Sequence, residues 1–240
     1  MSYILAEELT KRYGTGDSAV DAVSGVGFRI APGEFVSIMG ESGAGKSTLL
    51  GILGAMSAPS AGRLTVDGID VYSLRPEQQA DFRREYLGFV FQSFHLVPYL
   101  TVVENVMLPL TVARLGRREK RAMAMAALAE VGLAEKADRL PGEISGGEKE
   151  RVAVARAIVN EPPVLLADEP TGNLDTRNTR EVMRMFQRLN DSGMTILMVT
   201  HSAECAGYAR RVLQLSDGRL AADREQTAAR PLRKAAGATG

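Results

Sequence analysis

The sequence has little cysteine, no excess of charge of either sign and no long apolar run, and each shortage excludes a class of protein. One of the 240 residues is a cysteine, Cys205, so no disulfide can form within the chain, and we expect a reducing compartment. No apolar stretch approaches the roughly 18–20 residues that a membrane-spanning helix needs. The first eight residues include Glu7 and Glu8 and no apolar core, so we expect no signal peptide.

The charge balance also bears on possible partners. Lysine plus arginine and aspartate plus glutamate each number 29, so the formal net charge is zero. A dedicated nucleic-acid-binding protein normally carries a basic excess, and we therefore expect no nucleic-acid partner. Hydrophobic residues make up 45% of the chain and charged residues 24%, which is ordinary for a globular protein of one large domain or two small ones.

Four short apolar runs are present, at residues 35–39, 89–91, 164–167 and 195–199. Because they lack polar alternation, they predict strands buried on both faces of a parallel sheet. Each run is followed by residues that could do chemistry: a glycine-rich loop, Gln92, Asp168 with Glu169, and His201. Open α/β sheets bind ligands at the carboxyl ends of their strands, so the sequence predicts one site assembled from four segments.

The remaining patterns suggest how the chain is divided. Residues 182–189 show helical periodicity and are closed by Gly193, and Asp-Gly pairs at 67–68 and 217–218 predict β-hairpins. Residues 92–160 have a helical, Ala/Met-rich character and are predicted to form an inserted helical subdomain, which leaves 1–91 and 161–221 as the core that carries the sheets. Residues 222–240 show little apolar periodicity and are predicted to be a mobile tail.

The loop after the first run fits the phosphate-binding pattern G-x-x-x-x-G-K-[ST]. Glycines let successive backbone N–H groups curl around phosphate oxygens, and the following helix directs its positive end at the same anion. Lys46 is predicted to neutralise the β- and γ-phosphates, and the Ser47 hydroxyl to ligate Mg²⁺. A chance match in a glycine-rich turn is the alternative, but the preceding buried strand and the following helix are what the motif requires. The predicted nucleotide-binding residues here are Gly40, Glu41, Ser42, Gly43, Ala44, Gly45, Lys46, Ser47 and Thr48.

Two adjacent acids, Asp168 and Glu169, follow the third apolar run. An acid at the end of a buried strand beside a phosphate loop can hold Mg²⁺ through its water shell, and a neighbouring acid can polarise an attacking water. The alternative is helix capping or a solvated turn, because Pro170 follows directly.

A second glycine motif, Ser145-Gly146-Gly147-Glu148, precedes a predicted helix. It could form another anion cradle, or Ser145 could simply be the helix N-cap. One nucleotide does not need two cradles from one chain, so we expect this one to serve a nucleotide on a second subunit.

Taken in order, these motifs over residues 3–220 resemble the ATP-binding-cassette ATPases. The resemblance implies an α/β P-loop NTPase fold, with a RecA-like parallel core, an antiparallel β subdomain and an inserted helical subdomain. It implies ATP and Mg²⁺ as cofactors and ATP hydrolysis as the activity. The motif at residues 144–148 departs mildly from the signature sequence of that family, because Ile144 stands in place of the common leucine and Glu148 in place of the common glutamine.

The same resemblance implies roles for individual residues. Tyr13 is similar to the aromatic residue that stacks on adenine, with a surface tyrosine packed on the first strand as the alternative. Gln92 resembles the residue that contacts Mg²⁺ and the attacking water, Asp175 the acid that couples two sites across a dimer, and His201 the histidine that touches the γ-phosphate. Glu169 is then the catalytic residue that orients or deprotonates the attacking water.

Residues 91–98, 100–110 and 170–175 resemble the lipoprotein-release, macrolide-export and cell-division group of this family. That group implies an integral membrane permease as partner, a head-to-tail homodimer with two ATP molecules, and a peripheral location at the cytoplasmic face of the inner membrane. Two alternatives remain: a non-transport cassette ATPase of DNA repair or translation, and a small-molecule P-loop kinase. The first usually carries a coiled-coil insertion or a second cassette, and the second has no need of Ser145-Gly146-Gly147.

Overall fold

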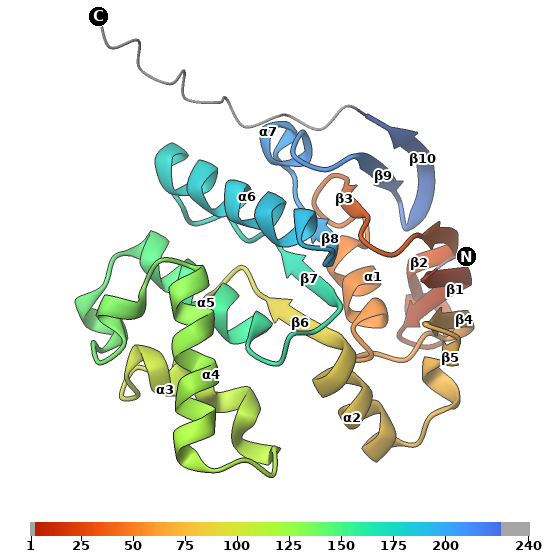
Figure 1. Ribbon diagram of the computed structural model, residues 1–240. Helices are drawn as coiled ribbons and strands as arrows, with labels where there is room; N and C mark the ends of the chain where they lie inside the picture. The colour runs from red at the N-terminus through yellow and green to blue at the C-terminus, as the bar shows by residue number, and fades with distance from the viewer. Residues whose placement is uncertain (1–2, 227–240) are drawn as a thin grey trace, which may run out of the picture.

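The computed structural model describes residues 3–226 and contains two β-sheets with helices around them (Figure 1). Its strands are β1 (Ile4–Tyr13), β2 (Val20–Ile30), β3 (Phe35–Met39), β4 (Ala61–Val66), β5 (Ile69–Asp70), β6 (Leu87–Val90), β7 (Val164–Asp168), β8 (Thr195–Val199), β9 (Arg211–Ser216) and β10 (Arg219–Glu225). Its α-helices are α1 (Lys46–Leu53), α2 (Pro76–Tyr86), α3 (Val102–Met107), α4 (Arg117–Glu130), α5 (Gly146–Ile158), α6 (Thr176–Asp191) and α7 (Ala203–Ala206).

The central sheet has the strand order β10-β9-β3-β8-β7-β6, and all its neighbours except the β9–β10 pair are parallel. Alternate residues of its inner strands enter two different cores, because side chains alternate across a sheet. Leu165 and Ala167 of β7 pack with α5 and α6 on one face, whereas Val164 and Leu166 pack with α1 and the antiparallel sheet on the other. This double burial explains why these strands read as unbroken apolar runs.

Three of the predicted strands agree with the structure within one residue, and one is shifted. The predictions 35–39 and 195–199 match β3 and β8, and β7 extends the predicted 164–167 by Asp168. The run predicted at 89–91 is instead β6, Leu87–Val90, and Phe91 lies beyond its end. The parallel pairing with β7 ends at Val90 opposite Ala167, so Phe91 is already in the segment that carries Gln92.

A second, antiparallel sheet has the order β2-β1-β4-β5. Both predicted Asp-Gly turns join neighbouring antiparallel strands, β4 to β5 and β9 to β10. At each turn both residues have positive φ, 49° and 78° at Asp67 and Gly68 and 48° and 73° at Asp217 and Gly218. These left-handed conformations match the twist of a two-residue hairpin.

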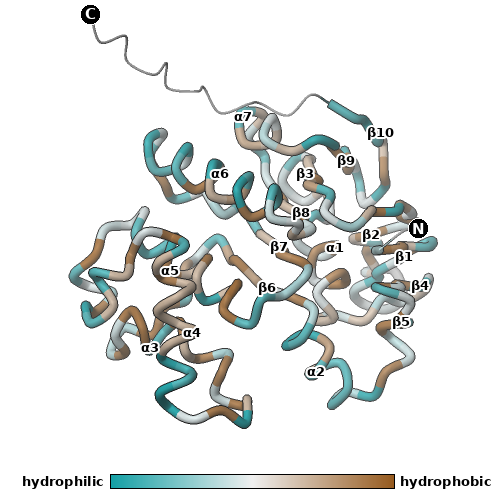
Figure 2. Tube along the Cα trace, in the orientation of Figure 1, coloured by the Kyte–Doolittle hydropathy of each residue, from teal (hydrophilic) through white to brown (hydrophobic). Residues whose placement is uncertain are grey.

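Between β6 and β7 the described chain contains helices and no strand. Helices α3, α4 and α5 pack around Val106, Leu128 and Val152, and they lie to one side of the central sheet in Figure 1. Figure 2 shows polar and apolar residues alternating along α6, whose apolar side faces the same core. The assignment of 92–160 as a separate subdomain stays a prediction. Within residues 3–226 the fold contains no helix with the length and apolar character needed to cross a membrane.

The predicted tail at 222–240 begins too early. Residues 222–225 belong to β10, where Ala222 lies opposite Gln214 and Asp223 opposite Leu213 of β9. The Arg211 guanidinium on β9 also donates hydrogen bonds to both oxygens of the Asp223 carboxylate, at 2.6 Å each. A backbone ladder and an ion pair therefore order a stretch whose sequence lacks apolar periodicity. Residues 227–240 lie outside the described part of the chain.

Candidate functional site

The loop at residues 40–47 joins β3 to the start of α1, and at Gly45 its backbone accepts only glycine. Gly43 and Gly45 have φ of +83° and +92°. A Cβ on Gly45 would lie 2.0 Å from the backbone oxygen of Ala22 on β2, whereas a Cβ on Gly43 would meet nothing within 4 Å. The Asp217–Gly218 turn also supports the loop, because the Gly218 N–H donates to the Ala44 oxygen. Helix α1 therefore begins at Lys46 with its N-terminus next to the curled loop.

Lys46 and Ser47 both point their polar atoms inside this loop. The Lys46 Nζ donates to the backbone oxygens of Gly40 and Glu41, each at 2.8 Å. An ammonium group carries three N–H donors, so the third remains for an anion in the loop. The Ser47 hydroxyl donates to the Asp168 Oδ1 at 3.2 Å, which connects the loop to the end of β7.

The two acids at the end of β7 have different surroundings. Burial raises the pKa of the Asp168 carboxyl, and the neighbouring charge of Glu169 raises it further, while the hydrogen bond from Ser47 opposes the shift. Glu169 has a left-handed backbone, φ +46°, and its N–H donates to the Val199 oxygen of β8. Its Oε2 lies 2.9 Å from the Nδ1 of His201, which follows β8. Only the first acid is thus directed at Ser47.

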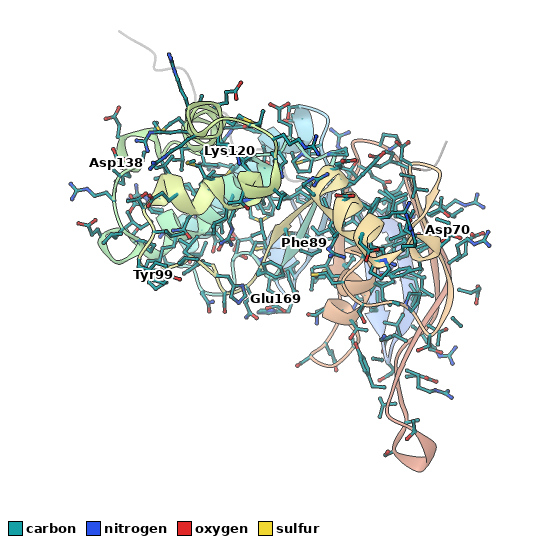
Figure 3. The ribbon with its side chains drawn as sticks, turned by 90° about the horizontal axis from the view of Figure 1, so that it is seen from below. Asp70, Phe89, Tyr99, Lys120, Asp138 and Glu169 are labelled. Atoms are coloured by element: carbon teal, nitrogen blue, oxygen red, sulfur yellow. The ribbon has the colours of Figure 1, made fainter. Side chains whose placement is uncertain are left out.

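A hollow of about 510 Å³ lies over the loop, within the usual size range of small-molecule sites. The glycine loop, Gln92, Glu169 and His201 reach it from the ends of four different strands, as the sequence predicts. Figure 3 shows Glu169 near the middle of the view, between the helical region and the core. The lining residues are Ala22, Ser42, Gly43, Gly45, Lys46, Ser47, Thr48, Gln92, Glu169 and His201.

The second glycine motif does not line this hollow. Ser145 is the N-cap of α5: its Oγ accepts from the Glu148 N–H at 3.3 Å, and its own N–H donates to the Glu148 Oε2 at 2.8 Å. Lys136 pairs with the other oxygen of Glu148. That hydrogen bond and those from Ser145 lower the pKa of Glu148 to about 2. The alternative interpretation of Ser145 as a helix cap is thus part of the structure, and Gly146, next in the chain, has open space where a Cβ would stand.

Asp175 is connected to this motif through Asn178. The Asp175 carboxylate caps α6 by accepting from the Asn178 backbone N–H at 2.8 Å and from its Nδ2 at 2.7 Å, and these bonds lower the pKa of Asp175. Asn178 in turn covers Gly147, where a Cβ would lie 2.1 Å from the Asn178 Oδ1. Neither Asp175 nor the motif at 145–147 reaches the hollow of its own chain.

Tyr13 stands apart from the hollow as well. It ends β1, its residue is 49% exposed, and the Lys11 Nζ lies 5.4 Å from its ring centre. The Lys11 ammonium thus lies over the ring, and the adenine role stays a prediction.

Three contributing residues were not predicted from the sequence: Ala22, Lys136 and Asn178. Ala22 contacts the glycine loop from β2, and the other two fix Glu148 and Gly147. Each of them contacts a motif from another segment of the chain. None of them belongs to a recognisable motif itself, so no sequence pattern identifies them.

Comparisons with known proteins agree on one family. A family model described as ABC transporter matches residues 23–172. The chain is 46% identical to a lipoprotein-releasing system ATP-binding protein LolD of Geobacter metallireducens, over 90% of this chain and 96% of the relative. It is 45% identical to a macrolide export ATP-binding/permease protein MacB of Syntrophobacter fumaroxidans, over 91% of this chain. The chain spans about a third of that exporter's length, 31%.

Solved structures show the same fold. The ATP-binding cassette MJ0796, in a dimeric post-hydrolysis state bound to ADP and Pi, superposes with a TM-score of 0.85 at 38% identity, covering 92% of this chain and 98% of that one. CbiO1 from Clostridium perfringens, part of the ABC transporter complex cbiONQ, gives 0.83 at 30% identity, covering 93% and 88%.

Proposed function

The chain belongs to the ABC transporter family of ATP-hydrolysing cassettes, and from this premise we propose that it powers a separate membrane permease as one half of an ATP-dependent homodimer. The single observation that carries the proposal is the unequal placement of the two glycine motifs. One lies in a hollow with Gln92, Glu169 and His201, and the other lies outside it.

Hydrolysis requires in-line attack of water on the γ-phosphate of ATP. In our proposal Glu169 orients that water and accepts its proton, and Gln92, which lines the same hollow, also contacts the water. Lys46 and His201 offset the charge that develops on the phosphate oxygens. Nucleotide binding then draws His201 from Glu169, to which it is bound at 2.9 Å, and thereby releases the carboxylate for catalysis.

The residues at the end of β7 fit a magnesium ion. Mg²⁺ prefers oxygen ligands and keeps several water and phosphate ligands of its own, so it needs few from the protein. The Ser47 hydroxyl and the Asp168 carboxylate supply a suitable pair, and the raised pKa of Asp168 marks a buried carboxyl that a cation would favour in its charged form. Gln92 is a further candidate ligand. When bound, Mg²⁺ neutralises phosphate charge during the transfer.

The outward cradle supports a dimer. Ser145 and Gly146 are exposed at the N-terminus of α5 and lie outside the hollow of their own chain, which is what a nucleotide on a second copy would need, while Asn178 covers Gly147. Two such contacts related by a two-fold axis close the assembly. Asp175, near the same surface, is proposed to couple the two sites, and Tyr13 to stack on adenine.

A second hollow, of about 540 Å³, is proposed to receive a cytoplasmic helix of the permease. It lies between β6 and the helical region, and Phe91, His95, Pro109 and Val112 are among its lining residues. Val112 in this lining is 66% exposed, so an apolar side chain is available to a partner helix. Phe91, one of the lining residues, directly precedes Gln92 in the chain. A helix seated in this hollow would therefore contact the segment that leads into the proposed catalytic site.

The likeness to LolD and MacB proteins supports the mechanotransmission type of transporter, in which the permease moves cargo on the outer side of the membrane. It also supports a peripheral location at the cytoplasmic face of the inner membrane. Cargo recognition belongs to the permease in this proposal.

Pull-down of the tagged Glu169→Gln chain with ATP from solubilised native membranes, read by mass spectrometry, tests the transport role. We expect an integral membrane protein with a large extracytoplasmic domain, and weaker capture when Val112 is also changed to Asp. Capture of soluble proteins, ribosomes or DNA alone would contradict the transport role and leave the ATPase.

A further inference from the structure

The segment that follows β6 is fixed to helix α5 by a single arginine. Arg156 lies in the last turn of α5, and its Nη1 donates to the backbone oxygen of His95 at 2.6 Å. Its Nη2 donates to the backbone oxygen of Phe94 at 2.7 Å. One planar guanidinium therefore binds two consecutive carbonyls, three residues at most beyond Gln92. Such a fork fixes both position and orientation of the backbone.

The same segment is also held at its other end. The Asn173 Nδ2 donates to the backbone oxygen of Gln92 at 3.0 Å, from the loop between Glu169 and α6. The Gln92 Nε2 lies 3.3 Å from where a Cβ of Gly172 would stand, and the Glu169 Oε2 lies 3.6 Å from that point. Residues 92–95 thus run between the loop of Glu169 and the end of α5, with little freedom at either end.

The charge of Arg156 is not neutralised by an ion pair. Within the described residues no carboxylate lies within 4 Å of its guanidinium, and burial lowers its pKa. The acid that interacts with it electrostatically is Glu150, itself buried on α5 with its Oε1 unpartnered and its pKa raised to about 8 by burial. Arg156 is half-buried and lines the second hollow, so its guanidinium loses part of its hydration, and the two carbonyls are the contacts that compensate for this loss. Arg156 is therefore specialised for holding this backbone.

We propose that Arg156 is a positioning residue for ATP hydrolysis: it fixes the Gln92 segment to α5, so that Gln92 and the Ser145 cradle at the other end of that helix keep one geometry. Helix α5 has 13 residues and is about 20 Å long, long enough to carry a displacement from the cradle to the Gln92 segment. The inference rests on the role proposed for Gln92 above. It assigns no contact between Arg156 and the nucleotide.

A double-mutant cycle on ATP hydrolysis by the whole chain tests this inference. The variants are Gln92→Ala, Arg156→Ala and the pair together, each measured for kcat, for KM and for ATP affinity. We expect Arg156→Ala to lower kcat about tenfold, because small misplacements of a positioned group cost this much or more, and to leave KM for ATP within about twofold. In the Gln92→Ala background the second substitution should change kcat less than about twofold, because the group that it positions is gone.

Arg156→Lys and Arg121→Ala serve as controls. Lysine keeps the charge but cannot bind two carbonyls as a fork, so we expect an intermediate kcat, and this variant decides the test if Arg156→Ala does not fold. Arg121 lies on α4 and pairs with the exposed Asp138, so its loss reports a general effect on the helical region. We expect it to leave kcat unchanged.

Each other outcome overturns the inference. A wild-type kcat in both Arg156 variants, or losses that multiply in the double variant, would assign Arg156 a structural role only. A wild-type kcat in Gln92→Ala would overturn both this inference and the role of Gln92 in the proposed function. A low kcat in Gln92→Ala with an unchanged one in Arg156→Ala would remove this inference alone.

Discussion

The two glycine motifs of this chain have the same elements, glycines followed by a helix N-terminus, but different surroundings. The loop at 40–47 is enclosed: Ala22 covers Gly45, Asp168 binds Ser47, and the hollow above it holds Gln92, Glu169 and His201. The motif at 145–147 is open at Ser145 and Gly146, which are both exposed: Gly146 has nothing within 4 Å of a Cβ position and the Ser145 hydroxyl binds within its own helix, whereas Asn178 covers Gly147. We propose that the first holds an anion within the chain and that the second offers donors to an anion outside it.

The largest effect that separates the two motifs is expected from Glu169→Gln. An amide cannot accept the proton of the attacking water, so kcat should fall about 10²- to 10⁴-fold, while ATP affinity changes little because Lys46 and the glycine loop remain. Phosphate release and titration with a fluorescent ATP analogue give the two quantities. Turnover near that of the wild type would remove the role assigned to Glu169.

A matched glycine pair sharpens the description of the enclosed motif. In Gly45→Ala the new Cβ would lie 2.0 Å from the Ala22 oxygen, so the loop must distort and ATP affinity should fall at least about tenfold. Gly43→Ala has a similar positive φ but open space, so it should cost only about 1 kcal/mol of stability. Titration with ATP and thermal unfolding measure both. Equal losses of ATP affinity in the two variants would show that the strain of a positive φ, and not the close contact with β2, is what limits substitution in the loop.

Ser145→Asp tests the open motif without removing the helix cap. Aspartate caps a helix about as well as serine, so the free energy of unfolding should stay within about 0.5 kcal/mol. A carboxylate at this position repels a phosphate, so hydrolysis should fall about tenfold or more. Binding of ATP to the single chain should remain, since Ser145 is outside its hollow. Full activity in this variant would mean that no nucleotide approaches Ser145.

The smallest effect on ATP hydrolysis is expected from Glu150, in the second turn of α5, where the measured quantity is the stability of the fold. Its pKa is raised from 4.5 to about 8 by burial, so the folded protein holds an additional proton between these values. The free energy of unfolding of the wild type should therefore fall as pH rises from about 4.5 to 8. Glu150→Gln lacks this dependence, so its stability relative to the wild type should rise by on the order of 4 kcal/mol over that interval, at about 1.4 kcal/mol for each unit of pKa shift. Urea unfolding at pH 5 and pH 8 measures it, and a constant difference would contradict the pKa shift.

The sequence predicts the enclosed motif better than the open one, for a physical reason. Strands buried on both faces appear in the sequence as unbroken apolar runs. The residues that follow parallel strands meet at one edge of the sheet, so the sequence alone predicts that Gln92, Glu169 and His201 lie near Lys46. The family and the α/β fold are confirmed by the comparisons. The roles of individual site residues stay predictions.

Other features depend on single contacts between distant segments, which leave no periodic pattern. The fork of Arg156 on the carbonyls of Phe94 and His95 joins positions about 60 residues apart, and a backbone acceptor carries no residue preference. Ala22 and the strand at 222–225 were missed for the same reason. The first contacts the glycine loop through its backbone oxygen, which carries no residue preference, and the second is part of an edge strand held by an ion pair.

The mass of the Glu169→Gln chain in solution, measured by light scattering with and without ATP and Mg²⁺, tests most directly whether the open motif completes the site of a second copy. We predict 25.8 kDa without nucleotide and twice that mass with it, and no doubling when Ser145→Asp is added. A mass that stays at 25.8 kDa with saturating ATP, or one that doubles equally in the Ser145→Asp variant, would contradict the account.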